Sequence, residues 1–304
     1  MSRSPRAGPG PVVSRPARIG TSAGRALLGA LLLALPAADR VAAQDWRTFR
    51  SFREYSGERE LEVEVKYLAG ELRIAPAEDG TLFRTNLRYD PELFQPEVSY
   101  ERERLVVRIT GVEKFEARRG EAGSLDLALG RDAPLVLDLG FGAGKGDLEL
   151  GGLPIRSADI STGASSTEIR FSSPNPERAS RLTIKGGAAE LRVIGLGNAN
   201  ADRIEVGGGV GEITLDFTGA WARASEVDID VGLAQLNLVL PSDLGVRIER
   251  ESLLASFDAS RMVNRDGALV SENWDSAAQR LTIRLDAALA SVNIRWVGSP
   301  ARSH

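Results

Sequence analysis

The sequence predicts an all-β protein, a β-solenoid built from coils of about 22 residues. A twelve-residue pattern occurs seven times, with an apolar–any–apolar triplet at each end and a polar residue before the second triplet. The five central copies begin 21, 22, 22 and 23 residues apart, and small residues fill the space between their triplets. A regular period of this length is typical of a solenoid, in which each coil stacks on its neighbours. The central copies span Leu139–Leu150, Ile160–Phe171, Leu182–Val193, Ile204–Leu215 and Val227–Leu238, and outlying copies span Val63–Ile74 and Ile283–Ile294.

Residues 1–43 have the composition of an export signal and lie outside the predicted fold. Five arginines precede a short apolar run, Ala26–Leu35, and the small residues Val41-Ala42-Ala43 predict a mature chain that begins near Gln44. This run is too short to span a bilayer, and we expect no transmembrane segment in the mature chain. The sequence therefore predicts Sec-type export, to a periplasm or to the cell exterior.

The charge balance and the absence of cysteine narrow the function classes. Without residues 1–43 the chain carries 32 basic and 41 acidic side chains, a net charge of −9. This balance opposes nucleic-acid binding, which depends on neutralising phosphates with a basic face. An exported chain without cysteine is stabilised by its core and not by disulfides.

Residues 44–134 predict a cap followed by an irregular β region. Four aromatic residues recur every third position near its start, with arginines between them, and are expected to close the open end of the solenoid; contact with a membrane or a partner is the alternative. Residues 82–89 and 98–109 alternate as strands, and the charged segment 111–124 is expected to be mobile. The four aromatic residues are Trp46, Phe49, Phe52 and Tyr55.

Residues 135–298 predict the solenoid and its closing strand pair. Apolar and polar residues alternate within each triplet, as in Leu182-Thr183-Ile184, which is the period of a half-buried strand. Glycine-rich bends join the two strands of a copy, and corners rich in glycine, proline and asparagine join one copy to the next. One coil is therefore strand, bend, strand, corner. Residues 246–257 are expected to form a degenerate coil, with Ala255 and Phe257 in its second strand, and residues 299–304 a disordered tail.

A leucine-rich repeat is the main architectural alternative, because its period is similar. That architecture requires an inward asparagine ladder and a helical segment in each repeat, and the sequence has neither.

The C-terminal part carries a resemblance to a known family. Asp266-Gly267-Ala268, the segment 274–283 and the closing strand Ser291–Ile294 resemble bacterial envelope proteins of the toast-rack type. This family is related to cell-wall-active-antibiotic response proteins and to adhesin-like β-solenoid domains, and the resemblance covers about Tyr55 to Val297. It implies an exported or surface-facing β-solenoid with no established catalytic residues. The segment Asp286–Ala290 replaces the family's final glycine-rich bend, which leaves the geometry of the last coil open.

One polar position per coil suggests a ladder of charges on an outer face. Four carboxylates precede the second triplets and are expected to stack at about 4.8 Å per coil, with two arginines placed to pair across coils. A cation- or glycan-binding face is one interpretation; the favoured one is a charge-balanced, solvated face that discourages edge association. The carboxylates are Asp147, Glu168, Glu190 and Glu212, and the arginines are Arg170 and Arg192.

The sequence predicts no catalytic, cofactor-binding or metal-binding residues. Gly140–Gly146 has the spacing of neither a dinucleotide-binding turn nor a P-loop, and Gly208–Ile213 lacks the aspartate of a calcium-binding repeat. The single histidine is the last residue, His304, and there is no cysteine, which opposes a Ser-His-Asp triad, a thiol nucleophile and a structural zinc site.

These observations predict a non-catalytic exported envelope protein, a surface scaffold, adhesion or recognition module that binds a protein or cell-wall partner. The alternative is a carbohydrate-active β-helix enzyme acting on an envelope or extracellular polysaccharide, with Asp228 and Asp230 as paired acids. A groove that collects three or more carboxylates would favour the enzyme.

Overall fold

The computed structural model describes residues 46–112, 123–250, 256–258 and 260–298. These residues form β-strands joined by turns, with one four-residue 3₁₀-helix, and the prediction of an all-β fold is confirmed. The described segments include no helix with the length and hydropathy that a membrane span requires. The predicted export signal, most of segment 111–124 and the tail from residue 299 lie outside the described residues.

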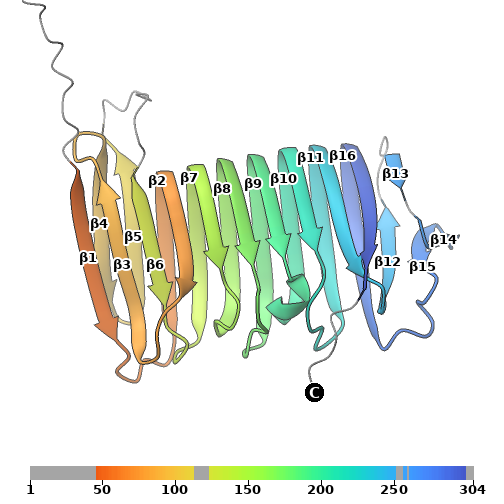
Figure 1. Ribbon diagram of the computed structural model, residues 1–304, viewed down its shortest axis with the longest axis horizontal. Coiled ribbons are helices and arrows are strands. Elements are labelled where there is room, and N and C mark those ends of the chain that lie inside the picture. The colour runs from red at the N-terminus through yellow and green to blue at the C-terminus, as the bar shows by residue number, and fades with distance from the viewer. Residues whose placement is uncertain (1–45, 113–122, 251–255, 259, 299–304) are drawn as a thin grey trace, which may run out of the picture. The chain divides into compact units, whose positions relative to one another are not determined.

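The strands form one hydrogen-bonded sheet system of sixteen strands (Figure 1). In chain order the elements are β1 (Arg47–Glu54), β2 (Leu61–Pro76), β3 (Thr81–Tyr89), β4 (Phe94–Glu101), β5 (Arg104–Gly111), β6 (Ser124–Leu129), β7 (Leu135–Glu149), β8 (Ile155–Arg170), β9 (Ala179–Ile194), η1 (Leu196–Ala199), β10 (Ala201–Asp216), β11 (Ser225–Pro241), β12 (Leu244–Arg250), β13 (Ser256–Asp258), β14 (Met262–Arg265), β15 (Ala268–Ser271) and β16 (Gln279–Val297).

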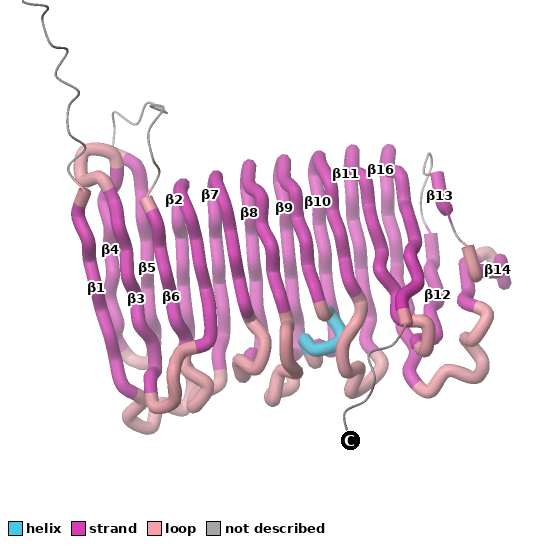
Figure 2. The backbone as a smooth tube through the Cα atoms, in the orientation of Figure 1, coloured by secondary structure: helices cyan, strands magenta, loops and turns pink. Residues whose placement is uncertain are grey.

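Seven long strands, β2, β7 to β11 and β16, are the coils of the solenoid. Each rises along one side of the molecule, turns over at one end and returns along the other side (Figure 2). We call the part before the turn the first limb and the part after it the second limb. Buried side chains mark the turn in β2, where residues 61, 63, 65 and 67 are buried before it and Leu72 and Ile74 after it. The two limbs therefore face each other across a shared core, as the strand–bend–strand pattern predicts.

Inward side chains of successive coils stack into columns. Ile204 in β10 lies opposite Leu182 in β9 and opposite Val227 in β11, and all three are buried. Because the strands are parallel and in register, apolar residues of one coil cover those of the next. The prediction of a β-solenoid is confirmed by this stacking.

One predicted alignment of the copies is wrong. Leu139 lies opposite Ile160, as expected, but Ile160 lies opposite Ile184, and Leu182 lies opposite Ala158. The copies in β8 and β9 are therefore displaced by two residues from the predicted alignment. A slip of two residues keeps every side chain on the same face of a strand, so the apolar pattern does not distinguish the two registers.

At the N-terminal end, β2 lies inside the stack. Its inner neighbour is β7, while its outer neighbours are β5 along the first limb and β6 along the second limb. Strands β4, β3 and β1 extend these outer layers in antiparallel fashion, with β1 at the end of the order. The boundary expected at residues 134/135 falls between β6 and β7, and the sheet runs across it because β2 pairs with β7.

At the C-terminal end, β16 is inserted between two strands that precede it in the chain. Its first limb pairs with β11 on one side and β12 on the other, and its second limb pairs with β11 and β13. The degenerate coil expected at residues 246–257 is formed by β12 and β13, with Val246 opposite Leu281 and Phe257 opposite Val292. Ala255 lies outside the described residues.

The turns over the end of the core bring backbones into close approach. A methyl group added at Gly163 would lie 2.3 Å from the carbonyl oxygen of Gly142 in the preceding coil, so glycine is required there. The last coil keeps the same turn without glycine. Ala287 and Leu289 lie opposite Val231 and Leu233, which places Ala288 opposite Gly232. The geometry left open for this coil is therefore a continuation of the regular one.

Candidate functional site

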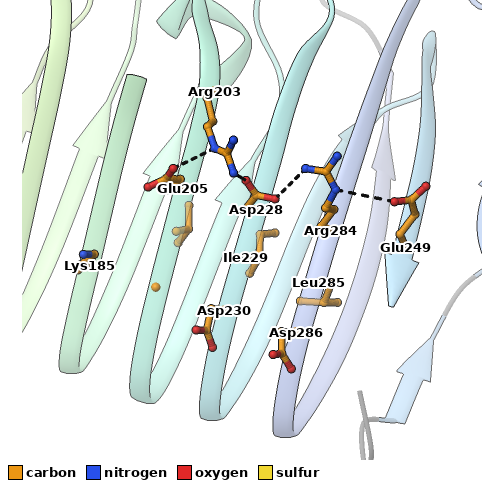
Figure 3. Close-up of a pocket in the computed structure, with 12 residues that line it drawn as sticks. Lys185, Arg203, Glu205, Asp228, Ile229, Asp230, Glu249, Arg284, Leu285 and Asp286 are labelled. Atoms are coloured by element: carbon orange, nitrogen blue, oxygen red, sulfur yellow. Dashed lines mark hydrogen bonds and ion pairs between the residues drawn. The ribbon is translucent and has the colours of Figure 1, made fainter. Parts of the chain in front are cut away.

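A charged depression of about 480 Å³ lies on the outer face of the first limbs, over β9 to β12 and β16 (Figure 3). It is lined by Lys185, Arg203, Glu205, Val206, Gly207, Asp228, Ile229, Asp230, Glu249, Arg284, Leu285 and Asp286. Alternation explains why its charged residues gather there. Every second residue of a strand points outward, and parallel pairing in register places the outward residues of neighbouring coils side by side.

One row of outward residues carries a charged side chain on four neighbouring strands. Glu205 lies opposite Asp228, Asp228 opposite Arg284, and Arg284 opposite Glu249. Arg203 binds Glu205 at 2.9 Å and Asp228 at 2.6 Å between nitrogen and oxygen. Arg284 lies 3.4 Å from Asp228 and 3.9 Å from Glu249, and its hydrogen bond to Asp228 raises the pKa of the guanidinium. The two arginines therefore neutralise most of this row (Figure 3).

The next row toward the turn is different. Asp230 lies opposite Asp286, and on the other side Asp230 lies opposite Gly207, which itself lies opposite Lys185. Within the part of the chain that the structure describes, the side chains of Asp230 and Asp286 make neither an ion pair nor a hydrogen bond. Both side chains are exposed. The depression thus holds two adjacent carboxylates that the fold leaves available.

Asp228 and Asp230, the acid pair of the enzyme alternative, lie in different surroundings. Asp228 and Asp230 share a face of β11, but Asp228 is held between two arginines while Asp230 is open to solvent. The depression does collect five carboxylates, which meets the condition set for the enzyme alternative; three of the five are engaged by Arg203 and Arg284.

The predicted ladder of four carboxylates is interrupted. Asp147 lies opposite Glu168, but Glu168 lies opposite Arg192, because the register between β8 and β9 differs by two residues from the expected one. Glu190 and Glu212 lie opposite each other in a different row, two residues closer to the turn than Glu168 and Arg192. The expectation of one continuous column is therefore wrong.

Arginines do bridge the coils on this second-limb face. Arg170 donates to Asp147 in the preceding coil and to Glu168 in its own, and these bonds raise the pKa of its guanidinium. Arg192 lies 3.8 Å from both Glu168 and Glu190. Glu212 accepts a hydrogen bond from Asn237 at 3.0 Å. Each carboxylate of the predicted ladder thus has a partner.

A second hollow, of about 1180 Å³, lies along the corners of β8 to β11 and the segment 273–279. Trp221 lines it and stacks on Phe217, and the indole N–H donates to the Phe217 carbonyl. Asn198 donates to the Phe171 carbonyl and accepts from the Ala220 amide. The central polar groups of this hollow therefore hold the corners together.

The N-terminal cap contains a buried carboxylate. Glu58 is 8% exposed and accepts hydrogen bonds from the Ser56 amide and hydroxyl, from Arg53 and from the Tyr100 hydroxyl. Burial alone would raise the pKa of Glu58, but hydrogen bonds from backbone amides, the Ser56 hydroxyl and Arg53 outweigh it and lower the pKa to about 2. Strand β1 carries two of the four N-terminal aromatic residues, Phe49 and Phe52, and is an outer strand here, so this segment does lie at the end of the stack.

Sequence reasoning missed the pairing of Arg203 and Arg284 around Asp228. The sequence does show a trace of this pairing, because three neighbouring coils each carry two charged residues two positions apart. They are Arg203 and Glu205, Asp228 and Asp230, and Arg284 and Asp286. Assigning their partners requires the register between coils. Among the residues that the structure describes, no group of three or more aspartate, glutamate, histidine or cysteine side chains is arranged to hold a metal ion.

The fold and this outer surface define a two-limbed β-solenoid with a charge-paired exterior. Residues 42–194 match the family model described as the N-terminal domain of toast_rack, DUF2154. The chain belongs to this family, as the resemblance predicts, and the matched stretch runs from the predicted signal cleavage site to the end of β9.

Three solved structures are similar to this chain. A "putative cell adhesion protein" from Clostridium sporogenes is 16% identical, with a TM-score of 0.44, and the match covers 83% of this chain and 100% of that one. A "putative adhesin" from Bacteroides fragilis is 11% identical, with a TM-score of 0.36 over 84% and 98%. A "putative lipid binding protein" from Parabacteroides distasonis is 10% identical, with a TM-score of 0.26 over 82% and 96%. No curated protein matches the chain. At these values the similarities assign neither a function nor a ligand to this chain.

Proposed function

We propose that the protein is a non-catalytic, exported envelope protein, a surface scaffold, adhesion or recognition module that binds a protein or cell-wall partner. The observation that carries this proposal is the engagement of Asp228 by both Arg203 and Arg284 at the centre of the charged depression. A general acid or base needs a carboxyl group that is free to exchange a proton with a substrate. Here the central carboxylate is committed to the fold.

Export to a periplasm or to the cell exterior is part of the same proposal. It is supported by the arginine-rich start, the apolar run and the small residues before Gln44. Fractionation of the producing cells and N-terminal sequencing test it. Recovery of the protein in the cytoplasm with residues 1–43 attached would contradict export.

Crosslinking in intact producing cells, followed by identification of the adducts, tests the recognition function. We expect covalent adducts between this chain and a distinct protein or cell-wall component. A chain that stays monomeric and without adducts in cells would contradict the proposal.

A second candidate is a carbohydrate-active enzyme, and the open pair Asp230 and Asp286 favours it over a purely structural surface. Neighbouring parallel strands lie about 4.8 Å apart, near the carboxyl separation of retaining glycosidases. Incubation with a panel of acidic and wall polysaccharides, with detection of new reducing ends, tests this activity. D230A and D286A should each abolish cleavage by a true enzyme, because they remove one carboxylate of this pair. No new reducing ends from any polysaccharide would exclude the candidate.

A further inference from the structure

One outward residue sits at the crest of each turn and forms a line along the molecule, which we call the crest column. Val210 in β10 lies opposite Ala188 on one side and Leu233 on the other, and Leu233 lies opposite Leu289 in β16. In the earlier coils the same position is alanine throughout. The flanking pairs Thr162–Gly186 and Ser166–Glu190 place Ala164 opposite Ala188. From β2 to β16 the column is Ala69, Ala143, Ala164, Ala188, Val210, Leu233 and Leu289.

The three large side chains of the crest column are not needed for the fold. Val210 is 54% exposed, Leu233 54% and Leu289 51%, so more than half of each side chain faces solvent. Coils β7 to β9 build the same turn with alanine at this position. A row of adjacent branched apolar side chains in water is a feature of interaction sites, whereas single exposed apolar residues are ordinary.

We call the outward positions on either side of the crest column its shoulders, and beside Val210, Leu233 and Leu289 the shoulders are acidic. On the first-limb side, three positions before the crest residues Leu233 and Leu289, stand the unpaired carboxylates of Asp230 and Asp286. On the second-limb side stands Glu212, which is exposed. The equivalent shoulder positions of these three coils are otherwise Gly207, Gln235 and Ser291, so they carry no lysine or arginine. An apolar strip with unneutralised negative charge beside it is complementary to an apolar strip with positive charge beside it.

We propose that Val210, Leu233 and Leu289, with Asp230 and Asp286 beside them, bind a basic amphipathic segment of another protein. This inference rests on the proposed recognition function and gives it a surface and a partner chemistry. Apolar side chains of the partner cover the crest, and its lysine or arginine side chains reach Asp230 and Asp286. The same carboxylates repel an anionic membrane surface. A second copy placed crest to crest would bring acidic shoulders against acidic shoulders.

Fluorescence anisotropy with a synthetic peptide of leucine and lysine tests the proposal. The matched peptides replace lysine by glutamate or leucine by serine. We expect only the leucine–lysine peptide to bind the purified protein, with an affinity that falls as salt is raised. The triple variant V210A/L233A/L289A should bind at least about tenfold more weakly, and D230N/D286N several-fold more weakly at low salt.

Two controls separate the crest from general attraction to an acidic protein. D79N/D159N removes the same number of charges from exposed sites elsewhere, and L68A removes an exposed leucine from the crest region of the first coil. Both should bind like the parent. Circular dichroism should show that every variant is folded, as expected for substitutions at exposed sites.

Several results would overturn the inference. One is that the leucine–lysine peptide does not bind at about 100 µM. Others are that it binds the parent and all variants equally, or that the glutamate peptide binds as tightly as the lysine peptide. Binding of anionic or zwitterionic vesicles that is lost in the triple variant would assign the crest to a lipid surface instead. A dimer in sedimentation that the triple variant dissolves would assign it to a second copy. Cell adducts formed without crest involvement would refute this inference alone, whereas absence of any adduct would refute the recognition function.

Discussion

The glycines in the turns allow a matched test of how closely the coils approach. A methyl group added at Gly163 would lie 2.3 Å from the Gly142 carbonyl oxygen, whereas one added at Gly187, in the same line one coil later, would lie 3.2 Å from the Gly163 carbonyl oxygen. Neither glycine has a backbone conformation that is unfavourable for alanine, so close approach is the only difference. Substitution by alanine should therefore be costly at Gly163 and cheap at Gly187.

The magnitude follows from the size of the overlap. Relief of a 2.3 Å carbon–oxygen contact requires a displacement of about 1 Å, a large fraction of the 4.8 Å spacing between strands, and stretches the neighbouring hydrogen bonds. Overpacking of this kind costs about 1–3 kcal/mol. At Gly187 the few tenths of an ångström are easily absorbed, and the lower entropy of the unfolded chain contributes about 0.4–1 kcal/mol in favour of alanine. We expect G163A to be less stable than G187A by about 2–3 kcal/mol.

Thermal and urea unfolding followed by circular dichroism measure this difference. For a chain of this size about 2–3 kcal/mol corresponds to a Tm difference of about 5–10 °C, with G163A the lower. The dependence on urea concentration should be the same for both variants, because the surface exposed on unfolding is the same. Equal midpoints for the two variants, or a lower midpoint for G187A, would refute the close-approach argument.

Three further predictions concern the core, the cap and the last coil. I204A should lower the free energy of unfolding by about 2–5 kcal/mol in urea titrations, because this side chain is fully buried between neighbouring coils; a loss under 1 kcal/mol would contradict the stacked core. Glu58 has a lowered pKa, so its stabilisation is complete above about pH 4.5 and is lost as the pH falls toward 2; E58Q should remove up to about 3 kcal/mol of this pH dependence, and parallel pH profiles for both proteins would argue against it. A chain that stops at Ala278 lacks β16 and should lose cooperative unfolding in calorimetry, since β11 and β12 each lose the strand that joins them, and a sharp transition at the parent Tm would disprove that dependence.

The inward side of every coil was predictable from the sequence, and the reason is local. A strand that is buried on one face alternates apolar and polar residues, so Leu182, Ile204 and Val227 could be assigned to the core without knowing their neighbours. The turns were also predictable, because glycine marks the places where backbones approach each other.

The outer faces were less predictable, because outward partners depend on register. The wrong alignment of β8 with β9 preserved every inward assignment. It placed Glu190 opposite Glu168, however, where the structure has Arg192. The charge pairing of Arg170 with Asp147 survives because it lies between β7 and β8, where the alignment is correct. An error in the predicted register therefore changes which outward residues are neighbours, and with them any candidate site on the exterior of a solenoid.

The insertion of β16 was not predictable from periodicity. Residues 246–257 and residues 283–294 both carry the coil pattern, and either could have stacked on β11. The longer strand has regular limbs on both sides of a complete turn, and it pairs with β11 over residues 281–297, whereas β12 and β13 are short. Burial over two full limbs favours the longer coil as the neighbour of β11, although it comes later in the chain.

At both ends of the stack, short strands cover the last complete coil. A complete parallel coil at an end would offer a long row of unpaired backbone groups, which is a template for stacking another copy. Here the complete coils β2 and β16 are covered by shorter neighbours. Three of the outermost strands, β1, β4 and β14, are joined in antiparallel fashion, and the fourth, β13, is parallel but only three residues long. Strand β1 carries Arg47, Arg50 and Arg53 along its exposed length. Such ends resist growth of the solenoid by addition of copies. The proposed recognition function therefore has the sides and the crest available to it, where the exposed apolar row and the unpaired aspartates lie.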